Sequence, residues 1–311
     1  MNDRQSRLGG VIPPVCTPFT PGLDIDTSSL ERLVDHLVAG GVDGLFVLGS
    51  TGEVAYLSDA HRREVLDVVV GRVAGQLPVL AGVIDMTTAR VAEHAAVAVA
   101  VGCDAVVVTA PFYTRTNPAE VERHFRLLGE RLPVPVYAYD IPVSVYTKLD
   151  PEMLLALAAD LLIAGVKDSS GDDAGLRTLT RQRERRDLDG FSVLTGSEVL
   201  VDVAMAMGAD GVVPGLGNVD PAGYARLVRT CRDGDWDAAR TEQERLIRLF
   251  DIVSVGDRTR MGASSAGLGA FKAALHRLGL IDCPVTAPPQ TPLSEAEVAA
   301  IGDILAEVGL G

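Results

Sequence analysis

Residues 161–172 read LLIAGVKDSSGD, an apolar run that ends in a lysine and then breaks into small, polar and glycine residues. This pattern predicts a buried strand that feeds a loop, with Lys167 where the strand stops. A lysine in apolar surroundings loses its proton more easily, and its free amine can attack a carbonyl to form a Schiff base. The alternative is a lysine whose ammonium reaches out to solvent at the rim of a sheet.

Lysine is scarce in this chain. Of the 28 basic residues only Lys148, Lys167 and Lys272 are lysines, and the others are arginines. A composition that uses arginine almost everywhere has kept a lysine at the end of a strand, where an amine can do chemistry that a guanidinium cannot. Lys272 falls in the middle of a predicted helix, and we interpret it as a structural amine.

Length and composition bound the class of protein. The 311 residues, 47% hydrophobic and 23% charged, suffice for one large domain or two small ones. A net charge of −14 argues against nucleic acid and anionic membranes as partners. The four cysteines are far apart and form no CxxC pair, which indicates neither zinc site nor disulfide framework. The N-terminus lacks the pattern of a signal peptide and no apolar run reaches membrane-spanning length, so we expect a cytoplasmic protein.

Eight β-rich runs recur at the spacing of strand–helix units, and segments with helical periodicity lie between them. Eight mostly apolar strands of this kind predict a parallel sheet covered by helices, closed into an α/β (β/α)8 TIM barrel. An open doubly wound sheet is the alternative, but no GxGxxG motif opens the first unit. The predicted strands are Val11–Cys16, Gly44–Leu48, Pro78–Val83, Ala105–Thr109, Val134–Tyr139, Leu162–Lys167, Phe191–Thr195 and Gly211–Pro214.

The chain continues well beyond the eighth predicted strand. Residues 221–232, 235–255, 264–278 and 294–308 all have helical periodicity, and proline-rich residues 284–292 are predicted to form a linker. We expect a barrel over residues 1–220, closed by the helix at about 221–232, and a C-terminal helical extension over residues 233–311 packed on the barrel.

In (β/α)8 enzymes the reacting groups lie at the carboxyl ends of the strands. The second strand ends in Gly49-Ser50-Thr51-Gly52-Glu53, where hydroxyls and N–H groups can bind a carboxylate; the alternative is a plain glycine-rich turn. After the fourth strand Phe112 is interpreted as a hydrophobic plug over the barrel mouth or a subunit contact, whereas Tyr113 keeps a hydroxyl that can carry a proton. At the fifth strand Tyr139 can shuttle protons, or it can fill the barrel as a plain aromatic.

The loops after the seventh and eighth strands, residues 195–198 and 214–218, consist of small residues that suit a polyhydroxylated ligand or a structural turn. The five histidines all fall in helical segments, so we expect neither a histidine triad nor a metal site, and we predict surface or interface positions for them. They are His36, His61, His94, His124 and His276.

Three motifs in order carry a resemblance to a known family. They are GSTGE at 49–53, YDIP at 139–142 and GVKDSSGD at 165–172, and together they resemble the dihydrodipicolinate synthase / N-acetylneuraminate lyase family of pyruvate-dependent class I aldolases. VCTPF at 15–19 and PFY at 111–113 also look like family motifs. The resemblance covers essentially the whole chain, including the helical C-terminal extension.

The resemblance implies a role for each catalytic candidate. Lys167 would form the Schiff base with the 2-oxo group of pyruvate or a pyruvate-derived substrate, and Tyr139 would be the proton shuttle that also meets the substrate carboxylate. Ser50 and Thr51 would hold that carboxylate and relay protons, and Tyr113 would reach into a neighbouring subunit's site. The resemblance implies no metal or separate cofactor and a homotetramer built as a dimer of dimers. The expected substrate-binding residues are Gly49, Ser50, Thr51, Ser169, Gly196, Glu198 and Gly215.

Departures from the family pattern concern the distal half of the substrate. In the synthase branch an arginine follows the tyrosine motif, where this chain has Ser144, and Asp140 replaces an asparagine. In the sialic acid lyases the loop after the seventh strand carries two acids. Here Glu198 keeps one and Val199 replaces the other, while Gly215 falls where those lyases have a serine.

The expected function is therefore a Schiff-base-forming lyase that cleaves a 2-oxo acid to pyruvate and an aldehyde, or condenses the two. A 2-keto-3-deoxy sugar acid is a candidate substrate, with Gly196, Ser197 and Glu198 facing its distal hydroxyls. The alternatives are a dehydratase that uses the same imine, a 4-hydroxy-tetrahydrodipicolinate synthase, and a catalytically silent paralogue that binds a small acid.

Overall fold

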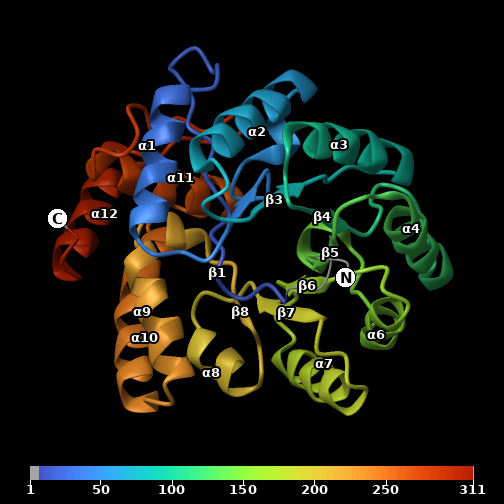
Figure 1. The fold of residues 1–311 in the computed structure, drawn as a ribbon. Helices are drawn as coiled ribbons and strands as arrows, with labels where there is room; N and C mark the ends of the chain where they lie inside the picture. The colour runs from blue at the N-terminus through green and yellow to red at the C-terminus, as the bar shows by residue number, and fades with distance from the viewer. Residues whose placement is uncertain (1–6, 311) are drawn as a thin grey trace.

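A ring of eight parallel strands occupies the centre of the computed structural model, which describes residues 7–310 (Figure 1). Neighbours pair in the order β1-β8-β7-β6-β5-β4-β3-β2. The ring closes between the first two strands, because the Phe46 N–H donates to the Pro13 carbonyl at 3.0 Å and the Val15 N–H donates to the Phe46 carbonyl at 2.9 Å. The strands are β1 (Gly10–Val11), β2 (Leu45–Val47), β3 (Val79–Gly82), β4 (Ala105–Thr109), β5 (Val136–Asp140), β6 (Gly165–Asp168), β7 (Ser192–Thr195) and β8 (Gly211–Val212). The predicted TIM barrel is confirmed.

Helices surround the barrel, and most of them begin at an aspartate, serine, threonine or asparagine whose side chain accepts a hydrogen bond from the first turn. The short helix α5 (Pro142–Val145) lies outside the predicted segments. The others around the barrel are α1 (Thr27–Ala39), α2 (Asp59–Val73), α3 (Thr88–Val101), α4 (Pro118–Arg131), α6 (Pro151–Ala159), α7 (Asp173–Arg185), α8 (Val201–Ala206) and α9 (Pro221–Arg232).

The C-terminal part adds α10 (Trp236–Phe250), α11 (Ala263–Arg277) and α12 (Glu295–Glu307). Helix α11 packs against α12 and against the 3-10 helix η3 (Gly215–Asn218), which follows β8. The segment after α11 reaches back to α1, where Arg32 donates to the Leu280 carbonyl and pairs with Asp282. These contacts place the segment after α11 beside α1.

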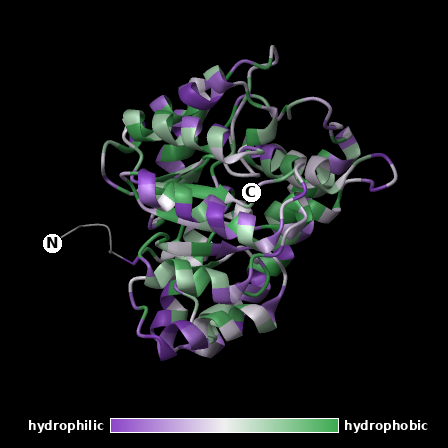
Figure 2. Cartoon of the chain, turned by 90° about the vertical axis from the view of Figure 1, so that its right-hand side faces the viewer, coloured by the Kyte–Doolittle hydropathy of each residue, from purple (hydrophilic) through white to green (hydrophobic). Residues whose placement is uncertain are grey.

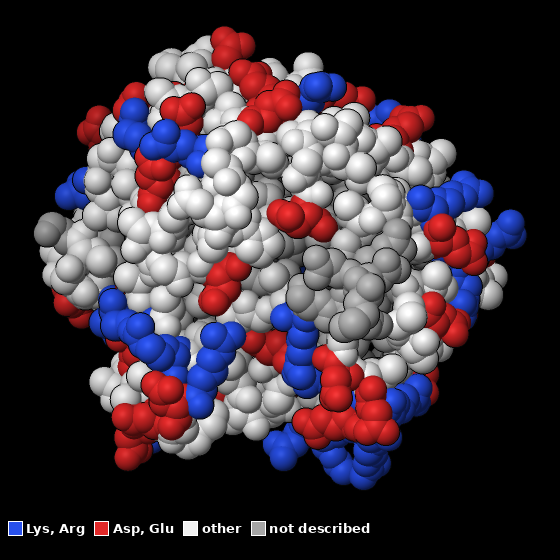
Figure 3. All heavy atoms as spheres, viewed as in Figure 1, with Lys and Arg blue, Asp and Glu red and all other residues white. Residues whose placement is uncertain are grey.

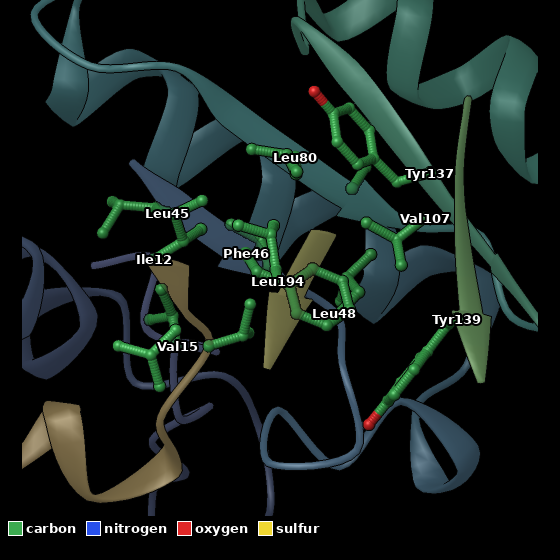
Figure 4. Packing of buried hydrophobic residues seen from close by; sticks show 14 of the residues in the cluster. Ile12, Val15, Leu45, Phe46, Leu48, Leu80, Val107, Tyr137, Tyr139 and Leu194 are labelled. Carbon is green, nitrogen blue, oxygen red and sulfur yellow. The ribbon is translucent and has the colours of Figure 1, made fainter. Parts of the chain in front are cut away.

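The strands are mostly hydrophobic, and the helices turn an apolar side toward them (Figure 2). Side chains from several strands fill the interior, among them Phe46, Leu194 and two tyrosines of β5 (Figure 4). The hydroxyls of Tyr137 and Tyr139 point to opposite ends of this cluster. Gly165 makes room for Tyr137, because a Cβ atom at that glycine would lie 2.6 Å from the tyrosine ring.

The five histidines lie in helices as predicted, but the prediction that all lie at the surface or an interface is wrong for His124. Its ring is 2% exposed, with Nδ1 at 2.8 Å from the Thr88 hydroxyl and its edge toward Phe125. Burial lowers its pKa to about 4, so His124 is neutral at physiological pH.

No helix in the described range, residues 7–310, is both long and apolar enough to span a membrane. The expectation about a leader sequence falls on residues 1–6, outside the described residues. On the face shown in Figure 3, basic side chains stand among acidic ones around the rim.

Candidate active site

Lys167 and Tyr139 form the centre of the candidate site. They are register partners on β6 and β5, and the Lys167 amine donates to the Tyr139 hydroxyl at 3.0 Å. Both are buried, Lys167 with 6% and Tyr139 with 3% of its surface exposed. The amine lies 4.1 Å from the centre of the Tyr139 ring and 5.0 Å from that of Phe46. An amine held in this way against aromatic faces, beside a phenol, has a proton acceptor within reach.

Lys167 differs from the other two lysines in having no carboxylate partner within ion-pair distance among the described residues. Lys148 pairs with Asp140, and Lys272 pairs with Glu53. An amine held in an ion pair is occupied by its carboxylate and is less open to a ligand. The arrangement therefore leaves Lys167 as the lysine placed for attack on a carbonyl.

The phenol of Tyr139 is tuned by its neighbours. Burial raises its pKa, but the charge of Lys167 and hydrogen bonding from Lys167, Ser50 and Ser169 outweigh burial, and the net pKa is lowered. The phenolate is accordingly reached at a lower pH than for a tyrosine in water. Tyr139 can thus accept a proton and return it during a reaction at the amine.

The loop after β2 lies beside this pair. A Cβ atom at Gly49 would come within 2.7 Å of the Phe46 ring, so only glycine lets the loop approach the barrel here. Ser50 is exposed and Thr51 half-buried. Within residues 7–310, the N–H groups of Ser50 and Thr51 donate to no protein acceptor. Two hydroxyls and two free N–H groups in adjacent residues suit a carboxylate.

The ends of β6, β7 and β8 contribute the remaining predicted site residues. A Cβ atom at Gly196 would lie 1.9 Å from the Ser169 hydroxyl, and one at Gly215 would lie 2.9 Å from Glu198 Oε1. Glu198 precedes α8 and accepts from the Leu216 N–H at 2.8 Å. Burial raises its pKa to about 7 against the effects of the β8 loop N–H groups and the charge of Lys167. The absence of a side chain at Gly196 therefore leaves space for Ser169, and its absence at Gly215 leaves space for Glu198.

Tyr113 is not brought to this site within its own chain. It follows β4 in the left-handed region, with φ of 67°, and 92% of its surface is exposed. Phe112, by contrast, packs in part against the core.

Two carboxylates that the sequence patterns did not assign as lysine partners support the site. Asp140, next to Tyr139, accepts from the Leu149 N–H at 3.1 Å as well as pairing with Lys148. Burial raises its pKa against the opposing effects of Lys148 and that N–H. Glu53 ends the β2 loop and reaches Lys272 on α11. A sequence signal existed in both cases, since each carboxylate stands inside a motif and each partner is one of only three lysines.

Comparison with known proteins places this geometry in a family. Residues 7–308 match the model of the dihydrodipicolinate synthetase family. The chain is 30% identical to a 4-hydroxy-tetrahydrodipicolinate synthase of Methanothermobacter thermautotrophicus over 80% of this chain and 88% of that protein. It is 33% identical to an uncharacterized DapA-like lyase of Halobacterium salinarum over 97% of this chain and 95% of that one.

A solved structure matches over nearly the full length. It is YagE from E. coli K12, a prophage protein of the dihydrodipicolinic acid synthase family in complex with pyruvate, with a TM-score of 0.90 and 28% identity. The match covers 98% of this chain and 100% of that one. With the barrel, the matched range and these relatives in agreement, the chain belongs to the dihydrodipicolinate synthetase family and is a lyase-type enzyme.

Proposed function

We propose that this enzyme forms a Schiff base between Lys167 and the 2-oxo group of its substrate, and that it cleaves a 4-hydroxy-2-oxo acid to pyruvate and an aldehyde or runs the reverse condensation. The observation that carries the proposal is the buried Lys167 amine, unpaired with any carboxylate in the described chain and 3.0 Å from the Tyr139 hydroxyl. The pyruvate bound to YagE, a relative of nearly the same fold, supports a 2-oxo acid as ligand.

The proposed reaction begins at Tyr139 and Lys167. Tyr139 as phenolate takes a proton from the Lys167 ammonium, the free amine attacks C2 of the 2-oxo acid, and water leaves to give a protonated imine. The imine accepts the electron pair of the C3–C4 bond when the 4-hydroxyl loses its proton, which releases the aldehyde and leaves an enamine. Protonation at C3 and hydrolysis of the imine then release pyruvate. The substrate carboxylate lies on the loop of Ser50 and Thr51.

The distal half of the substrate faces the β6 and β7 ends in this proposal. A cavity of about 180 Å³ there has Ser169, Gly196 and Ser197 in its wall. Acidic residues, hydroxyls, glycines and one leucine line it, and no basic side chain does. The carboxylates and hydroxyls of this wall can accept hydrogen bonds from hydroxyl groups of a substrate, and the carboxylates repel a second substrate carboxylate. This supports a hydroxylated aldehyde half, as in a 2-keto-3-deoxy sugar acid, and disfavours the synthase reaction.

The test is reductive trapping. The protein is incubated with pyruvate and borohydride, and the mass increase is mapped to peptides. We expect the label on the Lys167 peptide alone. A folded protein without label would contradict both enzymatic proposals and leave the paralogue that only binds a small acid.

A dehydratase is the second candidate, and Glu198 is the observation that favours it. A carboxyl group with a pKa of about 7 is protonated in about half of the molecules at neutral pH, and the protonated form can give its proton to a departing hydroxyl. Incubation with 2-keto-3-deoxy sugar acids separates the two reactions, since a lyase yields pyruvate and a dehydratase yields a dehydrated 2-oxo acid that still carries all the substrate carbons.

We also propose a cytoplasmic homotetramer, a dimer of dimers in which Tyr113 completes the site of a neighbouring subunit. The 92% exposure of Tyr113 in its own chain supports this placement, because a tyrosine this exposed is available to a partner.

A further inference from the structure

We propose that Glu53 and Lys272 are positioning residues through which the C-terminal part of the chain fixes the pose of the Ser50–Thr51 loop, and so sets affinity for the substrate carboxylate. The inference rests on the proposed function, since it concerns the carboxylate-binding step of the same site. It assigns to the segment after α10 a part in substrate binding, although that segment supplies none of the residues proposed to touch the substrate.

Glu53 is held from several sides at the end of the loop. Its side chain is fully buried and forms an ion pair with Lys272. Oε2 also accepts from the Ala287 N–H at 2.8 Å and from the Gln290 side-chain amide at 2.9 Å. The backbone of Glu53 is left-handed, with φ of 57°. A glycine adopts this conformation without strain, so the presence of glutamate indicates that its side-chain contacts outweigh the backbone cost.

Lys272, the partner of Glu53, is itself held in place by several contacts. Its side chain is 1% exposed, its amine donates to the Val285 carbonyl at 2.9 Å, and the ammonium lies 4.1 Å from the centre of the Phe19 ring. Burial lowers its pKa against the effect of Glu53. A buried ion pair adds little net stability compared with apolar side chains of the same volume. Because the Glu53–Lys272 pair joins two segments that are far apart in the chain, we interpret it as a contact that positions the β2 loop.

The Ser50–Thr51 loop depends on the position of Glu53. Its backbone turns back through the Gly52 N–H to the Gly49 carbonyl at 3.0 Å and the Glu53 N–H to the Ser50 carbonyl at 3.1 Å. The Thr17 hydroxyl donates to the Gly52 carbonyl at 2.8 Å. Because the N–H groups of Ser50 and Thr51 have no protein acceptor in the described residues, the turn that ends at Glu53 is what keeps them aimed. A displaced Glu53 would move the carboxylate-binding groups and leave Lys167 on its strand.

The test measures the pyruvate concentration that gives half-maximal borohydride labelling of Lys167. The main variant is the double substitution Glu53→Gln/Lys272→Met, which leaves no unpaired buried charge. We expect its half-saturating pyruvate to rise about tenfold, as for one weakened hydrogen bond to a carboxylate, with complete labelling at saturating pyruvate. A merely structural role would lower the melting temperature or the active fraction without moving this concentration.

The matched control is Arg260→Gln/Glu297→Gln, which breaks another ion pair of the C-terminal part that does not touch the β2 loop. We expect the control to keep the wild-type half-saturating concentration. A half-saturating value of the double variant within about twofold of wild type would overturn the proposal. If the double variant fails to fold, Gln290→Leu decides, because it removes one contact of Glu53; an unchanged half-saturating concentration there overturns the proposal as well. Absence of label in the wild-type protein would instead overturn the proposed function, and this inference with it.

Discussion

Tyr139 and Lys167 are register partners on neighbouring parallel strands, and this pairing alone brings a phenol within 3.0 Å of an amine. Parallel strands in register point the side chains of paired residues to the same side of the sheet. The backbones of the proposed proton acceptor and the proposed nucleophile are therefore held side by side by hydrogen bonds of the barrel strands.

Lys167→Arg should abolish borohydride labelling with pyruvate and lower turnover by on the order of 10³-fold or more, although it keeps the positive charge, because a guanidinium does not form the imine. Peptide mass mapping checks this. Lys148→Arg is the control and should keep the label. Label retained in Lys167→Arg would mean that another amine is the nucleophile.

Tyr139→Phe should keep the ring that packs edge-on against Phe46, and so should keep the fold, while the rate of imine formation falls by about 10²–10⁴-fold. Because the pKa of Tyr139 is lowered, the wild-type labelling rate should rise with pH through a pKa below 10.0, the ordinary value. Rapid-quench labelling across pH measures both. If the labelling rate of Tyr139→Phe still rose with pH in the same way, Tyr139 would not be the proton acceptor.

Glu198→Gln should change how stability depends on pH. The unfolded carboxyl ionises near 4.5 and the folded one near 7, so its contribution is full below about pH 4.5 and is lost as pH rises toward 7. The variant should lack this loss, about 2 kcal/mol after allowance for its partial exposure. Thermal melting of both proteins between pH 5 and 8 isolates the group. If the melting temperatures of the wild type and the variant changed with pH in the same way, Glu198 would not be the group responsible.

Asp140→Asn should change the free energy of unfolding by less than about 1 kcal/mol, because its amide oxygen still accepts from Leu149 and Lys148 is exposed enough to be hydrated. Asp140→Ala leaves the Leu149 N–H without an acceptor and should cost about 1–3 kcal/mol. Urea unfolding compares the two variants. Equal losses would show that the ion pair, and not the loop hydrogen bond, supplies the stability.

Tyr113→Asp should leave the fold of one chain intact, because the side chain is 92% exposed, and should weaken subunit association. Analytical ultracentrifugation should give a tetramer for the wild type and smaller species for the variant. A wild-type protein that sediments as a monomer at micromolar concentration would contradict the proposed assembly.

The barrel could be predicted because each strand is a short apolar run bounded by turn residues. The strand Ala105–Thr109 and the helix over residues 221–232 match to the residue. Helix α5 was missed because one turn of helix is too short for a periodic signal. The division into a barrel and an extension at residue 220 stays a prediction.

The candidate site could be predicted only as far as local pattern reaches. A strand-end lysine, a strand-end tyrosine and a glycine-rich loop are each visible in a few residues. The pairing of Glu53 with Lys272 joins segments far apart in the chain, and no local period encodes it. His124 was misplaced for a related reason, since its helix turns it toward Thr88 and the core rather than outward.

The scarcity of lysine has a consequence for the chemistry of the whole protein surface. The proposed cleavage would release an aldehyde, and aldehydes modify free amines, much as sugars glycate proteins over time. Outside the site the chain has two lysine side chains, of which Lys272 is buried against Glu53 and Lys148 is partly exposed in its pair with Asp140, so few side-chain amines are open to such aldehydes. Arginine supplies most of the cations instead, so the composition leaves few lysines on which such adducts could form.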